Sequence, residues 1–137
     1  HANDVVSHNN SRIRCTPVDF SEDILLISAN SNVVGIDEAQ FFDEGIVNLI
    51  ATLAYVHDIS IIVSGLEKDA TMNPFGPMPN LLAIADDVLK LSAVCMKCKE
   101  YPANFTYKKN NGNSNQIEIG GDELYEARCF KCWKNNS

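Results

Sequence analysis

The sequence lacks any apolar run of membrane-spanning length, because Asp, Ser or Lys interrupts every hydrophobic stretch. It also has few basic residues, with 11 Lys and Arg against 18 Asp and Glu and a formal net charge of −7. This balance disfavours an anionic membrane or a nucleic-acid backbone as the main partner. No secretory or transit signal lies near the first residue, His1, and because His1 is not Met we expect the natural N-terminus to lie upstream.

A phosphate-binding glycine loop is also missing, because no G-x-x-x-x-G-K-[ST] run occurs in the sequence. The stretch VVGIDEAQFF nevertheless reads as a buried strand over residues 33–37 that ends at Asp37 and Glu38. In nucleotide-hydrolysing and kinase folds, a carboxylate at such a strand end binds magnesium. The alternative is an exposed acidic turn. We therefore predict half of a phosphoryl-transfer site in these residues, with the phosphate-binding half lying upstream of them.

Cysteine, by contrast, is present in a distinctive arrangement. Four of the five cysteines form two Cys-x-x-Cys pairs, Cys95 with Cys98 and Cys129 with Cys132. Without secretory features, such pairs favour a tetrahedral zinc site in a reducing compartment over disulfides or a single redox pair. The remaining Cys15 is interpreted as an ordinary half-buried thiol.

Helical and strand patterns alternate along the first two thirds of the chain. Helices are predicted over residues 21–27, 43–55 and 80–85, and strands over residues 33–37, 59–64 and 88–94. We expect Ser21 to cap the first helix through its hydroxyl. This alternation indicates a parallel sheet with crossover helices. Because ligands of such sheets lie beyond the carboxyl ends of the strands, Asp37, Glu38, residues 64–66 and Cys95 are all candidates for one site.

The pattern changes after Cys98. Residues 105–107 and 116–119 are predicted to form the two strands of a β-hairpin, joined by the polar turn KKNNGNSN. Because a cysteine pair flanks this segment on each side, we interpret it as a long loop that a metal holds at both ends, close to a ligand. Gly120 would let its backbone approach that ligand closely or take a positive φ. Trp133, directly after the last cysteine, is expected to cover the metal-binding knuckle.

These motifs together resemble the type II thymidine kinases, the cytosolic and bacterial class. The matching stretches are IDEAQFF, NPFGPMPNLLAIADDVLKLSAVCMKC, IGGDELYEARCFKC and, more weakly, DVVSHN, in the family's order over nearly the whole chain. The resemblance implies an α/β fold with a partial P-loop (RecA-like) parallel sheet and helices over residues 1–94. A small zinc-binding lasso domain that contains a β-hairpin would follow over residues 95–137. The family's P-loop strand and glycine loop lie upstream of the residues given.

The resemblance also implies a reaction. Members of the family transfer the γ-phosphoryl group of ATP to the 5′-hydroxyl of thymidine, which gives dTMP for DNA precursor synthesis. We therefore expect magnesium, structural zinc, a cytoplasmic location, a homotetramer and feedback inhibition by dTTP, with neither a nucleic acid nor a membrane as partner. Without a P-loop, the chain as written is expected to be inactive by itself.

The expected site residues follow from the motifs. Asp37 matches the magnesium-side acid and Glu38 the catalytic carboxylate, with Ala39 and Gln40 beside them at the nucleotide. Residues that match the thymine pocket and the lasso around the base are Phe41, Leu66, Phe75, Gln116, Ile117, Glu118, Ile119, Gly120 and Tyr125. The matching zinc ligands are Cys95, Cys98, Cys129 and Cys132. Ala70 stands where the family commonly has an aromatic residue.

Two other interpretations stay open. The string DEAQ also resembles a helicase-type ATPase box, although such proteins need a basic nucleic-acid surface and this chain is acidic and short. The chain could instead be a non-catalytic, zinc-stapled module for binding or assembly.

Overall fold

The computed structural model describes residues 3–7, 9–109 and 124–135. The chain divides into two compact units, His1–Gly65 and Leu66–Ser137, and each is described by itself. Among the residues described, no helix combines the length and the hydrophobicity needed to cross a bilayer.

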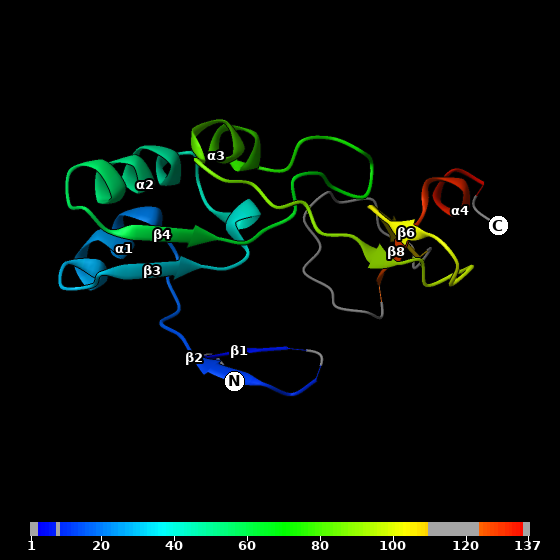
Figure 1. Ribbon diagram of the computed structural model, residues 1–137, viewed down its shortest axis with the longest axis horizontal. Helices are drawn as coiled ribbons and strands as arrows, with labels where there is room; N and C mark the ends of the chain where they lie inside the picture. The colour runs from blue at the N-terminus through cyan, green and yellow to red at the C-terminus, as the bar shows by residue number, and fades with distance from the viewer. Residues whose placement is uncertain (1–2, 8, 110–123, 136–137) are drawn as a thin grey trace. The chain divides into compact units, whose positions relative to one another are not determined.

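The first unit combines an N-terminal hairpin with a small α/β layer pair (Figure 1). Its elements are β1 (Asp4–Val6), β2 (Arg12–Arg14), α1 (Ser21–Ser28), β3 (Val33–Ile36), the 3-10 turn η1 (Ala39–Phe41), α2 (Gly45–Tyr55) and β4 (Ser60–Val63). The strands β1 and β2 pair antiparallel, whereas β3 and β4 pair parallel with Val33 opposite Ser60 and Ile36 opposite Val63. The predicted strand–helix–strand order and the parallel pairing are thus confirmed for these two strands.

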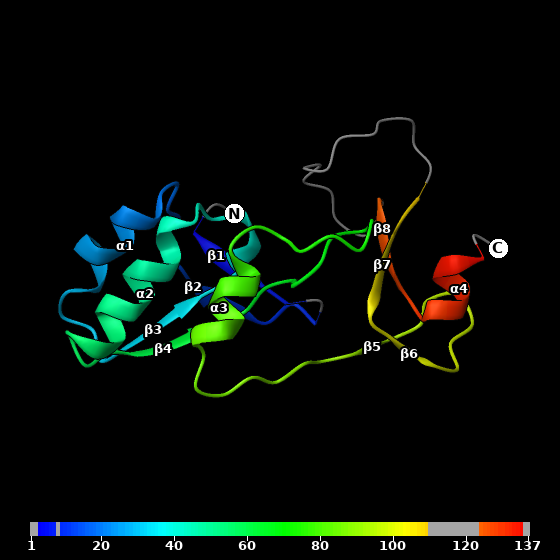
Figure 2. The ribbon, with the colours of Figure 1, turned by 90° about the horizontal axis from the view of Figure 1, so that it is seen from above.

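The core of this unit lies where α1 and α2 pack beside each other and α2 packs on β4. Its buried apolar side chains are Ile24, Ile36, Ala39, Ile46, Ile50, Leu53 and Ile59. In α2 the buried residues recur at positions 46, 50 and 53, which is the helical spacing that predicted this element. Figure 2 shows α1 and α2 running side by side.

The first turns of α1 and α2 share one carboxylate. Asp43 accepts hydrogen bonds from the Ser21 backbone N–H (3.1 Å), the Ser21 hydroxyl (2.9 Å) and the Gly45 N–H (3.0 Å). The prediction that Ser21 caps α1 through its own hydroxyl is therefore wrong. Ser21 is the first helical residue, Phe20 is the N-cap without a side-chain hydrogen bond, and Asp43 supplies the acceptor from outside the helix.

The second unit is built from short elements. These are α3 (Met78–Ile84), β5 (Ala93–Val94), β6 (Pro102–Ala103), β7 (Phe105–Lys108), β8 (Tyr125–Arg128) and α4 (Phe130–Lys134). Both strand pairs are antiparallel, β5 with β6 and β7 with β8. The helix α4 packs against β7 and β8, as Figure 2 shows. The predicted helix over residues 80–85 and the strand over 105–107 are confirmed with small changes in their bounds.

One prediction for this unit is wrong, and another is not tested by the described residues. Residues 88–92 do not form a strand, and only Ala93–Val94 pairs, antiparallel with β6 rather than within a parallel sheet. The apolar side chains there are exposed, with 81% of the Leu89 and Leu91 surfaces accessible. An apolar pattern therefore does not by itself predict a strand, because a strand also needs a neighbouring strand to pair with. The described partner of β7 is β8, which was not predicted, while the expected strand over residues 116–119 lies outside the described residues.

Candidate functional site

The first candidate site lies at the carboxyl ends of β3 and β4. Asp37 directly follows β3, and its Oδ1 accepts a hydrogen bond from the Ser64 hydroxyl at the end of β4 and one from the Glu38 N–H at 3.0 Å. The backbone ties the same two strand ends together, because the Ser64 N–H donates to the Ile36 carbonyl at 2.9 Å and the Ala39 N–H to the Ser64 carbonyl at 3.0 Å. Asp37 is exposed, so its carboxylate is held in place yet accessible to a ligand.

Glu38 occupies a backbone conformation that non-glycine residues rarely adopt, with φ 54° and ψ 41°. This turn breaks the strand direction and starts η1, which carries Ala39 and the buried Gln40. The Gln40 side-chain amide donates a hydrogen bond to Glu38 Oε2. Left-handed conformations of this kind cluster at functional sites, where surrounding contacts hold them. The turn thus leaves Asp37 and Glu38 exposed while Ala39 and Gln40 are buried beneath them.

The second candidate site is the cysteine cluster of the second unit. The Sγ atoms of Cys95, Cys98, Cys129 and Cys132 all lie within 4.8 Å of one another. Four sulfurs bound tetrahedrally to zinc at ~2.3 Å would be about 3.8 Å apart, and Cys98 Sγ and Cys129 Sγ are separated by 4.0 Å. None of the five cysteines is in a disulfide. The four thiols therefore fit a structural zinc ion, as the two Cys-x-x-Cys pairs predicted.

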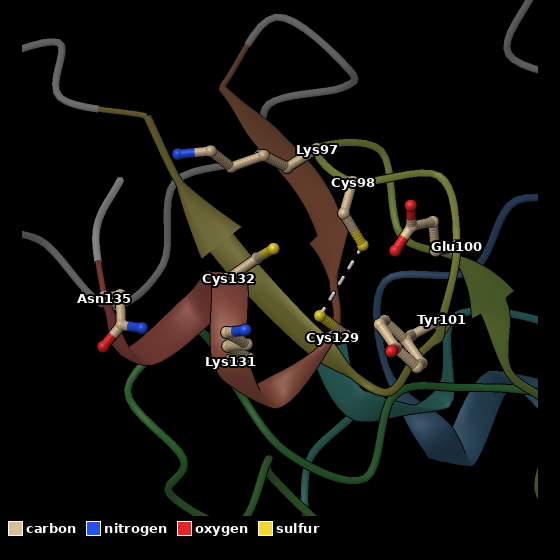
Figure 3. Close-up of a pocket in the computed structure, with 8 residues that line it drawn as sticks. All are labelled: Lys97, Cys98, Glu100, Tyr101, Cys129, Lys131, Cys132 and Asn135. Atoms are coloured by element: carbon tan, nitrogen blue, oxygen red, sulfur yellow. Dashed lines mark hydrogen bonds between the residues drawn. The ribbon is translucent and has the colours of Figure 1, made fainter.

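The local chain delivers these sulfurs from two knuckles. Cys95 follows β5 and is fully buried, and the knuckle turns so that the Lys99 N–H donates to the Cys95 carbonyl at 2.8 Å. Cys129 follows β8 and Cys132 lies in α4. Figure 3 shows the sulfurs of Cys98, Cys129 and Cys132 directed into one hollow, which Lys97, Glu100, Tyr101, Lys131 and Asn135 also line.

The thiols of this cluster do not ionise equally. Burial of Cys95 opposes its ionisation, but backbone hydrogen bonds from Cys129, Cys98 and Lys97 outweigh that effect and lower the pKa of Cys95 to about 6. Burial and hydrogen bonding to the other three thiols raise the pKa of Cys132 to about 12. Four thiolates at this spacing repel one another, so a bound cation would stabilise them together.

The predicted base-binding residues fall in both units. Phe41, at the end of η1, exposes 49% of its surface, and Leu66, the first residue of the second unit, exposes 47%. Phe75 is half-buried, as is Tyr125 in β8. Leu66 and Phe75 lie at the base of a short hairpin, which the Phe75 N–H closes by donating to the Glu67 carbonyl at 3.1 Å. The remaining predicted base contacts lie outside the described residues: Gln116, Ile117, Glu118, Ile119 and Gly120.

Sequence reasoning missed a charged cluster beside the second knuckle. Arg128 is 8% exposed, its guanidinium carbon lies 3.4 Å from the Tyr107 ring centroid, and its Nε donates to Glu126 Oε1 at 2.6 Å. Its Nη1 also donates to the Cys132 carbonyl at 3.2 Å. Residues two apart on a strand share a face, so the YEAR stretch contained a signal for the Glu126–Arg128 pair.

Comparison with known proteins gives consistent matches. The sequence pattern of the family described as thymidine kinase matches residues 1–133. A thymidine kinase of Bacteroides thetaiotaomicron is 45% identical over 130 residues, which are 95% of this chain and 64% of that protein. A thymidine kinase of Porphyromonas gingivalis is 44% identical over 134 residues, 98% of this chain and 64% of that protein. The chain thus spans somewhat less than two thirds of the length of these relatives.

Proposed function

Since this chain belongs to the thymidine kinase family, we propose that the protein transfers the γ-phosphoryl group of ATP to the 5′-hydroxyl of thymidine and yields dTMP. The observation that carries the proposal is the acid pair after β3, of which Asp37 is fixed to the end of β4 by Ser64. A carboxylate at the carboxyl edge of a parallel strand pair suits a nucleotide-bound metal. The family match favours this function over a helicase-type ATPase or a non-catalytic assembly module.

Asp37 is proposed to hold magnesium or a water of its hydration shell. Mg²⁺ binds through one or two carboxylates and keeps several waters, so one exposed, oriented Asp is a suitable donor. When bound, the ion neutralises charge on the phosphates during transfer. The Ser64 hydroxyl and the Glu38 N–H both donate to Oδ1 of Asp37. These two hydrogen bonds orient the carboxylate that would bind the ion.

Glu38 is proposed as the catalytic carboxylate. Phosphoryl transfer has a loose transition state, so the enzyme contributes mainly positioning and charge neutralisation. Glu38 would accept a hydrogen bond from the attacking 5′-hydroxyl and take its proton late, because a carboxylate is too weak a base to deprotonate an alcohol beforehand. The amide of Gln40 donates to Oε2 of Glu38 and orients this carboxylate, while Ala39 and Gln40 are proposed to lie beside the nucleotide.

The thymine base is proposed to be held by apolar side chains and by lasso backbone. The side chains are Phe41, Leu66, Phe75 and Tyr125, and the backbone contacts come from residues 116–120. Zinc bound by Cys95, Cys98, Cys129 and Cys132 would hold this lasso domain, which we place over residues 95–137, in a preorganised form. Preorganisation reduces the ordering entropy that binding would otherwise cost.

The assembly and setting are proposed from the same family membership. We propose a homotetramer that dTTP inhibits, with ATP and thymidine as the substrates and without a nucleic acid or a membrane as partner. A cytoplasmic location suits a zinc site built from reduced thiols.

A phosphate-transfer assay tests the proposed reaction. The chain, joined at its start to a strand and a G-x-x-x-x-G-K-[ST] loop, should form labelled thymidine monophosphate from γ-labelled ATP only when magnesium is present. Transfer to water alone would indicate an ATPase instead. Absence of transfer to thymidine in a folded, zinc-loaded protein that carries the loop would contradict the proposal.

A further inference from the structure

The only tryptophan of the chain, Trp133, joins two segments that are distant in sequence. Its indole N–H is shared between the carbonyl of Thr106 in β7 at 3.1 Å and the carbonyl of Ala70 at 3.3 Å, 63 residues earlier. The side chain is half-buried, so solvent competes only partly with these bonds. Covering the metal-binding knuckle, which was the expected role, does not account for a hydrogen bond to residue 70.

An aromatic cluster supports this indole. The ring centroids of Phe105 and Trp133 are 5.5 Å apart, those of Phe105 and Phe130 are 5.4 Å apart, and those of Phe130 and Trp133 are 6.4 Å apart. Lys68 adds a second link to the same segment as Ala70, because its Nζ lies 5.2 Å from the centre of the Phe105 ring. The segment around Ala70 therefore contacts the cluster at two points.

That segment is itself a stiff hairpin, which we call the 67–75 hairpin. Lys68 and Pro74 form an antiparallel bridge, and the Asp69 N–H donates to the Asn73 carbonyl at 2.9 Å. Inside the turn, Oδ1 of the buried Asp69 accepts hydrogen bonds from the Thr71 N–H, the Thr71 hydroxyl and the Asn73 N–H. Because these bonds hold the turn together, a displacement at Ala70 is transmitted to both ends of the hairpin.

The other side of the indole is fixed to the cysteine cluster. Trp133 directly follows Cys132, and its backbone N–H donates to the Cys129 carbonyl at 2.9 Å. The carbonyl of Cys132 is held in turn by Arg128. A metal bound by these cysteines therefore sets where the indole lies, and the indole N–H meets the 67–75 hairpin.

We propose that Trp133 is a positioning residue that couples metal binding at the four cysteines to the placement of Leu66 and Phe75, at the two ends of the 67–75 hairpin. This inference rests on the proposed function only in taking those two side chains as contacts to the nucleoside base. The coupling itself is a property of the second unit and is measurable without any nucleoside.

Hydrogen exchange on the zinc-loaded chain tests the coupling. Trp133→Phe keeps an aromatic ring but removes the N–H, and it should speed exchange at the Asp69 and Phe75 amides roughly fivefold, the effect expected for loss of one hydrogen bond. The matched control is Phe130→Leu, which trims the same aromatic cluster but keeps the indole donor and should leave these two amides near their wild-type rates. Removing zinc with a chelator should speed the same amides in the wild type and add little in Trp133→Phe.

Two results would overturn the proposal. One is that zinc-loaded Trp133→Phe exchanges these amides at the wild-type rate. The other is that chelation speeds their exchange equally in the wild type and in Trp133→Phe. If Trp133→Phe fails to retain zinc, replacing the residue by benzothienylalanine gives the same comparison, because that side chain has the indole's shape without the N–H. Calorimetric titration with thymidine tests separately whether Leu66 and Phe75 contact the base. A looser hairpin with unchanged thymidine affinity would contradict the thymine-pocket assignment and leave the coupling established, whereas weaker affinity is the result expected.

Discussion

At the scale of single residues, the left-handed backbone of Glu38 determines where its carboxylate lies. With φ 54°, the residue ends the β3 direction and holds its carboxylate next to the Gln40 amide. A side chain that served only as a turn-former would be replaced more favourably by Asn or Gly, which tolerate this conformation better. The presence of Glu there fits a role for the carboxylate itself.

The first prediction concerns that carboxylate. In the protein extended by a P-loop, Glu38→Gln should lower kcat on the order of a hundredfold or more, because size is kept while the proton acceptor and charge are removed. KM for thymidine should change little. The measurement is steady-state kinetics over thymidine concentration, with Glu22→Gln on the exposed face of α1 as the control. A loss confined to KM would assign Glu38 to binding instead.

Asp43 gives a second prediction, on pH dependence. Hydrogen bonds from the Ser21 N–H and the Ser21 hydroxyl are the main causes that lower the pKa of Asp43 below its ordinary value of 3.8. A lowered folded-state pKa means that the stabilisation is present above about pH 3.8 and is lost as the pH falls through the folded value. Asp43→Asn should therefore lower the urea midpoint at pH 7 and differ less from wild type near pH 3. An equal deficit at both values would show that the charge is not the cause.

Gly45 is constrained by the same carboxylate. A Cβ on Gly45 would lie 2.6 Å from Asp43 Oδ2 and 3.1 Å from Ser21 Oγ. The approach of Asp43 to both helix starts thus depends on a glycine whose φ is not positive. Glycine is required at position 45 because a Cβ would collide with the Asp43 carboxylate, and the sequence alone did not reveal this requirement.

At the scale of elements, the knuckles allow a direct prediction about metal. Purified chain should contain close to one zinc per molecule, and Cys95→Ser should lose most of it together with the local structure of the two Cys-x-x-Cys knuckles. Structural zinc contributes on the order of 10 kcal/mol to folding of small domains. Elemental analysis gives the stoichiometry, and Cys15→Ser, which alters the cysteine outside the cluster, is the matched control. A folded, metal-free protein with cross-linked cysteines would contradict the prediction.

The strand β8 carries the next prediction. Tyr125→Ala should weaken thymidine binding more than Lys109→Ala, because we place Tyr125 in the base site, whereas Lys109 pairs with Glu126 at 3.7 Å. Titration calorimetry with thymidine compares the two variants. Equal losses, or none, would place the base elsewhere.

The elements also show which parts of the fold local sequence patterns predict and which they do not. The α1, β3, α2 and β4 segments have a local hydrophobic period that agrees with their packing, so their order was predicted. Residues 88–94 had the same apolar character, but a strand needs a partner for its backbone, and such a partner is not encoded locally. The Asp43 bridge and the contact of Trp133 with Ala70 join residues 22 and 63 positions apart, and no local pattern predicts them. The cysteine cluster was predictable because zinc coordination fixes spacing within each knuckle.

At the scale of the whole molecule, the proposed function assigns to this chain one half of a phosphoryl-transfer site. It provides the acid pair after β3 but no G-x-x-x-x-G-K-[ST] run to bind the β- and γ-phosphates. We predict that a polypeptide of these 137 residues alone has negligible thymidine kinase activity, although its zinc site forms. The phosphate-transfer assay described above, run on the polypeptide with and without an added P-loop, is the test. Robust transfer by the shorter form would mean that the phosphates bind elsewhere.

The exposed stretch before β5 has a practical consequence for handling the protein. Leu89 and Leu91 are 81% exposed and Val94 is 66% exposed, in a segment that forms no strand before Ala93. Extended apolar backbone of this kind is a template for intermolecular β-pairing and aggregation. Lys90, between the two leucines, acts against such pairing by charge repulsion between copies. Salt screens that repulsion, so concentrated solutions of the protein should aggregate most slowly in buffers of low ionic strength. A Lys90→Glu variant would keep a charge between the leucines and resist aggregation, whereas Lys90→Val would aggregate faster.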